Sequence, residues 1–389
     1  MTINKLMAGA KGDPLNSTGA DVANAVNGLI DVVDLQTSPT VLIGIDSLTA
    51  GGAGASSYNT FFQNYMRGAK GFGGLYLPFA AYMQFTPEQY QYSLCSVYSV
   101  GSGRKWVDDV ADWSDERRVN AVNGLGFYYD GTQAATGSGF GVNIGFKYTK
   151  IRLFYRQHPA GGTFKIDQPT FGQSYALVDT AGVESLQYVD VDLYRDEAPT
   201  APGTDANIGY NLRIIDVAGD VQVHGCLILT GDKAPIIVND ARSGRLLSDY
   251  IKVSATVRDD FIKHCGVTHA IFNAGTNDAL TSTPEQFEAD MVSACQILKD
   301  NSIDTHIVIP NLNNLDSTIQ YRQNYLNVAA QFGFKVYDTP TLWGDHADFV
   351  SKGWMFDATH PNDYFTKLLG QSYSNLIVNS AKYEEPTLL

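Results

Sequence analysis

The chain has 389 residues, of which 44% are hydrophobic and 17% are charged, and its formal net charge is −14 at pH 7. This length exceeds that of a typical single domain, so we expect two or three units, each able to bury a hydrophobic core. The acidic balance argues against binding to a phosphate backbone, which needs clustered lysine and arginine, and we expect no nucleic-acid partner.

The amino-terminal residues lack the features of a targeting segment. Residues 1–15 carry Lys5 and Lys11 but not the apolar core of a secretory signal, and no stretch of the chain approaches the length of a membrane span. We therefore expect no signal peptide and no membrane insertion. The protein would be cytoplasmic or would be exported by another route, such as release inside a virus particle.

Residues 1–40 are predicted to form an attachment or oligomerisation segment rather than part of a catalytic core. Apolar residues recur at helical spacing over 20–33, which predicts a helix with one apolar face that needs a partner. The spacing is also compatible with a short coiled coil, so this face could pack on its own domain or on copies of itself.

A serine follows the first buried strand that the sequence predicts. Residues 41–45 are apolar and largely β-branched, which is typical of a parallel strand buried on both faces. Ser47 would then lie at the carboxyl end of this strand, where open α/β sheets bind their ligands. An ordinary strand that ends in an Asp-Ser turn has the same pattern, so this stretch alone does not assign catalysis.

Residues 101–234 are predicted to form an inserted, jelly-roll-like β-sandwich. Short alternating segments such as 220–229 replace the helical periodicity, and turn residues separate them. The insertion would divide an α/β domain into residues 41–100 and 235–389, and its two ends should lie close together. Such sandwiches often bind carbohydrate, although aromatic residues are more often core. The candidate stacking residues are Trp106, Trp113, Tyr128, Tyr129 and Tyr194.

After residue 235, strand and helix patterns alternate along the chain. The predicted strands cover residues 236–239, 270–273, 306–310 and 334–337, and the predicted helices cover 246–257, 284–299, 318–331 and 364–381. This alternation favours βαβ units and a three-layer α/β fold with a mainly parallel sheet.

Two later motifs accompany the serine. Residues 271–278, Ile-Phe-Asn-Ala-Gly-Thr-Asn-Asp, close a strand with a glycine and polar side chains, and Asp357 precedes His360 by three residues. With Ser47 and a glycine block at Gly244, these blocks resemble the SGNH (GDSL-type) hydrolase family of esterases. The resemblance implies a three-layer α/β/α hydrolase domain and serine esterase chemistry.

Two blocks depart from the family's usual pattern. The first block usually reads Gly-Asp-Ser, whereas here Ile45 precedes Asp46 and the glycine lies one place earlier. The second block has charged residues at 240–242, where small residues are more usual. Contact with an acidic sugar and simple solvation are the two alternatives open for Arg242 and Arg245.

The resemblance assigns a role to each candidate residue. A serine hydroxyl needs a base to remove its proton, and a third group must hold that base. Ser47 would attack the ester carbonyl, His360 would take and return the proton, and Asp357 would orient the imidazole. The oxyanion donors would be the backbone N–H groups of Ser47 and Gly244 and the side-chain amide of Asn277. A side chain at Gly244 could obstruct the substrate, but Gly244 could equally be a turn glycine and Asn277 a helix cap.

No metal ion or organic cofactor is expected. The seven histidines are scattered, and none belongs to an HExxH or HxH cluster. The four cysteines, Cys95, Cys226, Cys265 and Cys295, have no CxxC pairing. We interpret them as free buried thiols, with disulfides left open.

Within the family, the order of the blocks resembles bacteriophage tail spike polysaccharide esterases, and residues 15–30 resemble the amino-terminal linkers of phage tail fibres and tail spikes. The resemblance implies an esterase that removes O-acetyl groups from a bacterial surface polysaccharide. It would act at the host cell surface as part of a virion, as a homotrimer that could contact other phage tail proteins through its amino-terminal segment.

Two other functions stay open. The first is a non-catalytic carbohydrate-binding or adhesion module, and the presence of Ser47, Asn277, Asp357 and His360 argues against it. The second is a cellular lipase or thioesterase, which the large insertion and the absence of a long apolar lid segment disfavour.

Overall fold

The structure of the protein is a computed structural model. It describes residues 39–45, 73–79, 95–100, 121–122, 127–130, 139–144, 148–168, 173–192, 211–230, 234–242, 244–311 and 315–380. Ser47 and nearly all of the predicted attachment segment lie outside these ranges.

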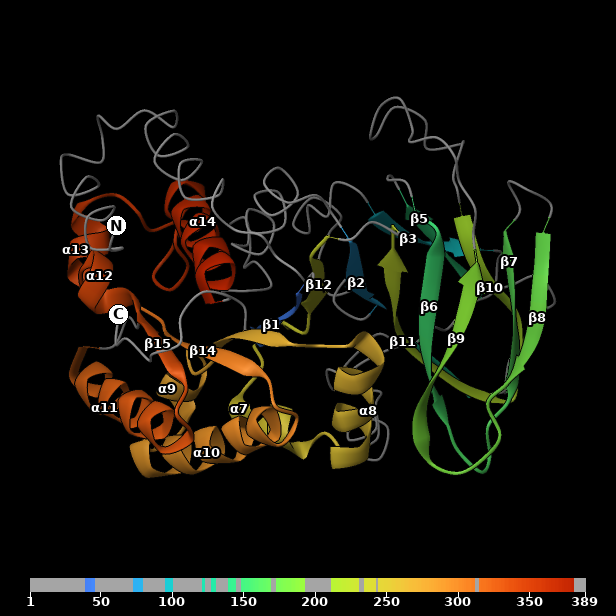
Figure 1. Ribbon diagram of the computed structural model, residues 1–389, viewed down its shortest axis with the longest axis horizontal. Coiled ribbons are helices and arrows are strands. Elements are labelled where there is room, and N and C mark those ends of the chain that lie inside the picture. The colour runs from blue at the N-terminus through green and yellow to red at the C-terminus, as the bar shows by residue number, and fades with distance from the viewer. Residues whose placement is uncertain are drawn as a thin grey trace.

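A ten-stranded sheet runs through both halves of the molecule (Figure 1). Six neighbouring strands are parallel: β15 (Lys335–Asp338), β14 (Asp304–Ile309), β13 (His269–Asn273), β1 (Thr40–Ile45), β12 (Ile236–Asn239) and β2 (Gly74–Pro78). Beyond β2 the sheet continues with antiparallel strands, namely β11 (Asp220–Leu229), β6 (Lys150–Gln157) and β9 (Ser185–Asp192), while β4 (Phe127–Asp130) also pairs with β11.

Helices cover both faces of the parallel strands, as Figure 1 shows. One face carries α7 (Leu247–Lys252), α8 (Ala255–Cys265), α10 (Pro284–Asp300) and α11 (Leu315–Phe332), with the short α9 (Asp278–Thr281) beside them; the other carries α12 (Thr339–Trp343), α13 (His346–Ser351) and α14 (Asp363–Ser380). Neighbouring residues of one strand enter different cores. Phe272 packs with Phe287 of α10, and Ile271 belongs to the core that contains Tyr373 of α14. The predicted three-layer α/β/α fold with a mainly parallel sheet is confirmed.

A second sheet of five antiparallel strands packs against the antiparallel end of the first. Its order is β3 (Cys95–Val100), β5 (Gly139–Ile144), β10 (Asn211–Ala218), β7 (Thr163–Gln168) and β8 (Gln173–Asp179). One apolar core contains Leu153 and Val223 of the first sheet together with Phe164 and Leu212 of the second. Leu77 of β2 joins the same core. The boundary of an inserted domain at residue 101 stays a prediction, because β2 and β3, which precede it, also contribute to this half.

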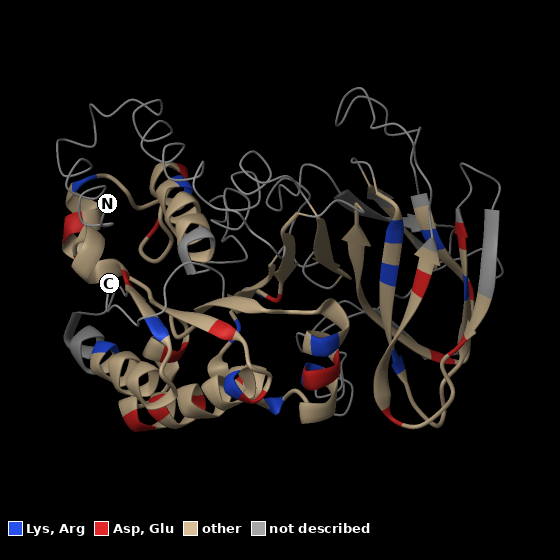
Figure 2. Ribbon diagram, in the orientation of Figure 1, with Lys and Arg blue, Asp and Glu red and all other residues tan. Residues whose placement is uncertain are grey.

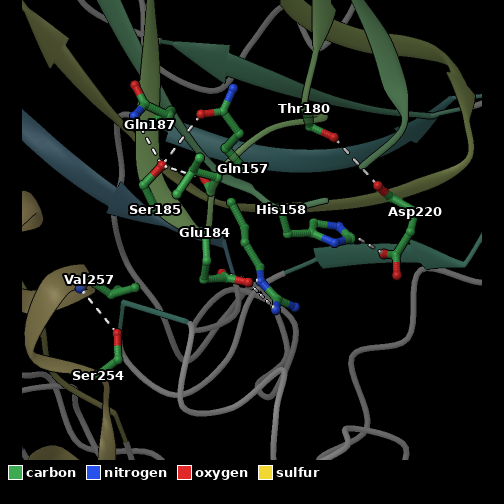
Figure 3. Close-up of polar contacts among 11 residues, drawn as sticks. Gln157, His158, Thr180, Glu184, Ser185, Gln187, Asp220, Ser254 and Val257 are labelled. Atoms are coloured by element: carbon green, nitrogen blue, oxygen red, sulfur yellow. Dashed lines mark hydrogen bonds and ion pairs between the residues drawn. The ribbon is translucent and has the colours of Figure 1, made fainter. Parts of the chain in front are cut away.

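The predicted helix over 246–257 is two helices in the structure. α7 ends at Lys252, and Val253 and Ser254 have extended ψ angles of 134° and 140°. The Ser254 hydroxyl accepts the backbone N–H of Val257 at 3.2 Å and so begins α8 (Figure 3). Serine is a preferred N-cap residue, which explains why the helix is interrupted here although the apolar spacing continues.

Charged residues of both signs are interspersed along the described chain (Figure 2). None of the helices in the described ranges is both long enough and apolar enough to cross a membrane. Nowhere in those ranges do three or more His, Cys, Asp or Glu side chains gather into a group that could hold a metal ion.

Arg152 of β6 fixes α8 to the antiparallel strands. Its Nη1 atom donates to the carbonyl of His264 at 2.6 Å, and its Nε and Nη2 atoms donate to the Asp190 carboxylate at 2.8 and 2.9 Å. The guanidinium carbon lies 4.0 Å from the centre of the Tyr188 ring, which itself packs edge-on against His264. One side chain thus links a helix of the α/β half to two strands of the other half.

We expect Arg152→Ala to lower the free energy of unfolding by about 1–3 kcal/mol, because it removes charge-assisted hydrogen bonds and leaves the His264 carbonyl without its donor. Urea denaturation followed by circular dichroism measures the change. Lys165→Ala is the matched control, since Lys165 makes an exposed ion pair with Asp216 at 3.0 Å and should change stability by less than about 1 kcal/mol. Equal losses in the two variants would contradict a linking role for Arg152.

Candidate active site

The carboxyl ends of three neighbouring strands, β12, β1 and β13, define the candidate site. β1 lies between the other two, with Ile43 beside Asn239 of β12 and Ile45 beside Asn273 of β13. Ser47 is the second residue after β1 and lies outside the described residues. Parallel pairing brings the loops that follow β12 and β13 to the edge of the sheet where β1 ends.

The loop after β12 is bound to β1 by its backbone. The N–H groups of Asp240 and Arg242 donate to the carbonyls of Ile43 and Ile45 at 2.9 and 3.0 Å. Within the loop, Nη1 of Arg245 donates to the Asp240 carbonyl at 2.7 Å and lies 3.3 Å from the Asp240 carboxylate. The start and the end of this loop are therefore held together beside the end of β1.

Gly244 lies in this loop with a φ of +70°, in the left-handed region. No described atom lies within 4 Å of a Cβ built at this position. Protein packing therefore does not require glycine here, whereas the backbone conformation does. Glycine adopts this positive φ without strain, so it allows the turn of the backbone just before Arg245.

Asn277, which follows β13, is bound to the neighbouring loop. Its Nδ2 atom donates to the Arg245 carbonyl at 3.0 Å. Asn277 is the N-cap residue of α9, but its side chain makes no capping hydrogen bond. Helix capping therefore does not explain why an asparagine occupies this position. A side-chain amide has two N–H groups, and the bond to the Arg245 carbonyl uses one of them.

Asp278 makes a second connection between the two loops. Its fully buried carboxylate accepts the backbone N–H of Leu247 at 3.0 and 3.3 Å and so binds the first turn of α7. Because neighbouring residues, Asn277 and Asp278, bind opposite ends of the segment from Arg245 to Leu247, the two loops are held as one unit.

The loop after β13 is also fixed from the side of α11. The Tyr325 hydroxyl donates to the Ala274 carbonyl. Gly275 has a φ of +102°, and a Cβ at this position would lie 2.1 Å from the Tyr325 hydroxyl and 2.8 Å from the Phe287 ring. Only glycine fits this close approach of the loop to the helices.

His360 and Asp357 form a hydrogen-bonded pair in the loop before α14. Nδ1 of His360 lies 2.9 and 3.1 Å from the two carboxylate oxygens of Asp357. Asp357 Oδ1 also accepts the backbone N–H groups of Thr359 and His360, at 2.7 and 2.6 Å. The His360 side chain is 19% exposed. With Nδ1 bound to the carboxylate, Nε2 is the nitrogen that can accept a proton from a nucleophile.

The loop geometry keeps the Asp357 carboxyl ionised. Partial desolvation acts to raise its pKa, but the backbone N–H groups of His360 and Thr359, followed by the His360 side chain, outweigh this and lower the pKa below its usual value. An ionised carboxylate can accept the Nδ1 proton of His360 and can stabilise the imidazolium that forms when the histidine takes up a proton.

Two other histidines lie near carboxylates in the described chain. His158 is 3.9 Å from Asp220 and His269 is 4.0 Å from Asp304, distances too long for hydrogen bonds. His158 is buried, and the nearby Ser185 hydroxyl is bound by Gln157 and Gln187 rather than by a histidine (Figure 3). Neither pair has the geometry of the His360–Asp357 pair.

The structure rules out the two environments considered for Arg242 and Arg245, and it places Tyr129 at a core. Arg245 faces neither a sugar nor solvent, because its side chain is fully buried against Asp240. Arg242 is bound to Asp249 at 3.1 Å and is largely buried. Tyr129 packs against the core between the two sheets, which fits a structural role. Trp106, Trp113 and Tyr194 lie outside the described residues, as does the side chain of Tyr128.

No family profile and no curated protein sequence matches the chain. Among solved structures, a peptidoglycan O-acetylesterase is similar with a TM-score of 0.60 and 13% identity, over 92% of this chain and 94% of that chain. The esterase EstA from Pseudoalteromonas sp. has a TM-score of 0.32 and 13% identity, over 38% of this chain and 80% of its own. An acetyl xylan esterase has a TM-score of 0.31 and 14% identity, over 36% of this chain and 81% of its own.

The first similarity extends over nearly the whole of both chains, so the shared fold includes the antiparallel strands as well as the parallel sheet. The other two are too distant to support a conclusion. Together with the sheet order and the two helical layers, the first similarity shows that this chain shares the three-layer α/β/α fold of that esterase, as the resemblance to the SGNH family predicts.

Proposed function

We propose that the protein is a serine esterase that removes O-acetyl groups from a bacterial surface polysaccharide. The observation that carries the proposal is the His360–Asp357 pair, whose Nδ1 to carboxylate distance is 2.9 Å and whose imidazole remains partly exposed. The fold of the peptidoglycan O-acetylesterase supports the class of reaction. Ser47 supplies the nucleophile in this proposal, because it directly follows β1 at the carboxyl edge of the sheet.

The reaction would proceed in two halves. His360 takes the proton of the Ser47 hydroxyl as its oxygen attacks the acetyl carbonyl, and then gives that proton to the departing sugar hydroxyl. A water molecule, activated in the same way by His360, hydrolyses the acetyl-serine and releases acetate. The negative oxygen that forms in each half would be bound by the N–H groups of Ser47 and Gly244 and by the second N–H of Asn277.

The biological setting is a further part of the proposal. A place in a phage tail, a trimeric assembly and contacts with other tail proteins depend on residues 1–40, nearly all of which lie outside the described residues. The carbohydrate-binding role of residues 101–234 is likewise proposed. The esterase chemistry does not depend on any of these points.

Wild-type protein should hydrolyse p-nitrophenyl acetate and release acetate from O-acetylated glycans, and Ser47→Ala should lower kcat by at least about a thousandfold because no nucleophile remains. Acetylated capsular polysaccharide and O-acetylated peptidoglycan are the two glycans to compare. Circular dichroism shows whether the variant is folded. Equal activity in both proteins would exclude Ser47 as the nucleophile, and no release from any ester or glycan would favour a non-catalytic binding module.

Asp357→Asn should lower kcat on the order of 10²- to 10⁴-fold with little change in KM. An amide in place of the carboxylate donates to Nδ1 of His360, which places the imidazole proton on Nε2 and prevents that nitrogen from accepting the serine proton. Steady-state kinetics with p-nitrophenyl acetate measure the effect. A variant with wild-type kcat would show that the Asp357–His360 pair has no catalytic role.

The same variant has a pH-dependent effect on stability. Because the pKa of Asp357 is lowered in the folded protein, its carboxylate stabilises the fold above about pH 4, the usual pKa of an aspartate, and this contribution is lost as the pH falls through the lower, folded-state value. Urea midpoints of wild type and Asp357→Asn should therefore differ at pH 7, and the difference should shrink as the pH falls below about 4. A difference that stays constant would contradict the lowered pKa.

An exposed phenylalanine adjoins the His360–Asp357 pair. Phe356 is 52% exposed, and its backbone N–H donates to the His360 carbonyl at 2.8 Å, so its position beside the pair is fixed. We expect Phe356→Ala to raise KM for an acetylated polysaccharide about fivefold and to leave p-nitrophenyl acetate hydrolysis unchanged, because only the longer substrate would cover the ring. Val350→Ala, at a residue of α13 that is 56% exposed and lies outside residues 101–234, is the control. Equal effects on both substrates would argue against sugar contact.

A further inference from the structure

A fully buried arginine lies next to the loops that would supply the oxyanion donors. The Arg245 guanidinium is bound to the Asp240 carbonyl at 2.7 Å, and its central carbon lies 5.0 Å from the centre of the Tyr250 ring. Transfer of a charged side chain out of water is costly even when a partner carboxylate is present. Stability alone therefore gives no reason to bury this residue.

Several buried polar atoms of Arg245 and Asp240 also lack a hydrogen-bond partner among the described residues. These atoms are Nε and Nη2 of Arg245 and Oδ1 of Asp240. Burial raises the pKa of the Asp240 carboxyl, and the neighbouring Arg245 opposes this rise. Each unsatisfied buried group lowers stability, because it has lost its hydrogen bonds to water and has gained none in the protein. Such a cost is typical of polar groups that are held in place for function rather than for stability.

The backbone of the same residue contacts Asn277. The Arg245 carbonyl accepts one N–H of the Asn277 amide at 3.0 Å, while the Arg245 side chain is bound to the opposite end of its own loop. Gly244, the residue before Arg245, would supply another donor. The orientation of two proposed oxyanion donors, the Asn277 amide and the Gly244 N–H, thus depends on the position of Arg245.

We propose that Arg245 is a positioning residue for the oxyanion donors. By binding Asp240, its guanidinium closes the loop after β12, so that its carbonyl fixes the rotamer of Asn277 and the Gly244 N–H keeps its direction. Arg245 does not contact the substrate in this arrangement. The inference rests on the proposed esterase function and assigns to it a residue that the catalytic motifs do not include.

A positioning role affects kcat rather than KM. Oxyanion donors act on charge that develops only in the transition state, so their misalignment leaves substrate binding largely unchanged. Loss of one donor lowers kcat by about 10²- to 10³-fold in a serine hydrolase, and misalignment should have a smaller effect.

The test compares Arg245→Met and Arg245→Lys with Arg258→Met, using p-nitrophenyl acetate kinetics and urea denaturation. Arg258 is a matched control, because it donates to the carbonyls of Tyr250 and Ile251 at 3.1 and 2.8 Å and not to the loop after β12. We expect Arg245→Met to lower kcat about 10- to 100-fold with KM within about twofold. The kcat of Arg245→Lys should lie between those of wild type and Arg245→Met. A lysine ammonium can donate to the Asp240 carbonyl, but it lacks the planar, forked donor geometry of a guanidinium.

Arg258→Met should lower stability and retain kcat. The pH dependence of kcat/KM should keep its shape in every variant, because neither arginine contacts His360. Wild-type kcat in Arg245→Met would overturn the proposal, and so would an equal fall of kcat in Arg258→Met, which would indicate general loosening. If Arg245→Met does not fold, the kcat of Arg245→Lys is the test of the positioning role. An unchanged kcat in Arg245→Lys would then overturn the proposal.

A second measurement does not depend on activity. Hydrogen exchange of the Asn277 side-chain amide, followed by NMR, should be faster in Arg245→Met or Arg245→Lys than in wild type, because the bond to the Arg245 carbonyl is weakened. Wild-type protein without esterase activity would exclude the proposed function, and faster exchange would still support the positioning role. An unchanged exchange rate would overturn that role whatever the activity.

Discussion

The parallel pairing of β1 with both β12 and β13 is the constraint on which the candidate site depends. Parallel neighbours end at the same edge of a sheet, so the loops that carry Ser47, Gly244 and Asn277 emerge together although they are far apart in the sequence. Hydrogen bonds from Asn277 to the Arg245 carbonyl and from Leu247 to Asp278 then join two of these loops. The sheet brings the loops close together, and these polar contacts fix the orientation of the loops after β12 and β13.

The same sheet continues from the parallel strands into the antiparallel half of the protein. β11 pairs with β2 at the end of the parallel strands, and the antiparallel strands that follow share a core with a second sheet. A continuous sheet and the contacts of Arg152 with His264 make the two halves one packed structure. The two halves therefore have fixed positions relative to one another, and in the proposed function this would fix a glycan bound by the antiparallel half relative to the candidate site.

The elements with strong periodic patterns could be predicted from the sequence. β12 lies at the expected residues, and the helix expected over 284–299 is α10, in which Phe287 and Leu298 are buried. Asp357 and His360 could be paired because a spacing of three residues within one loop is a local property. The interruption at Ser254 was missed because the helical spacing continues through it. The burial of Arg245 could not be predicted, since a polar turn becomes buried only when the neighbouring loop and helix pack over it.

The central claim is that Ser47 and His360 act on one another, and the most direct test is the distance between them in an experimental structure of the protein. A crystal structure that resolves residues 46–72 would give the separation between the Ser47 Oγ and the His360 Nε2. The proposed mechanism predicts a separation of about 3 Å, within reach of a hydrogen bond. It also predicts that the Asn277 amide is directed toward the Ser47 hydroxyl. A separation beyond about 6 Å, or an Oγ that faces away from the imidazole, would contradict it.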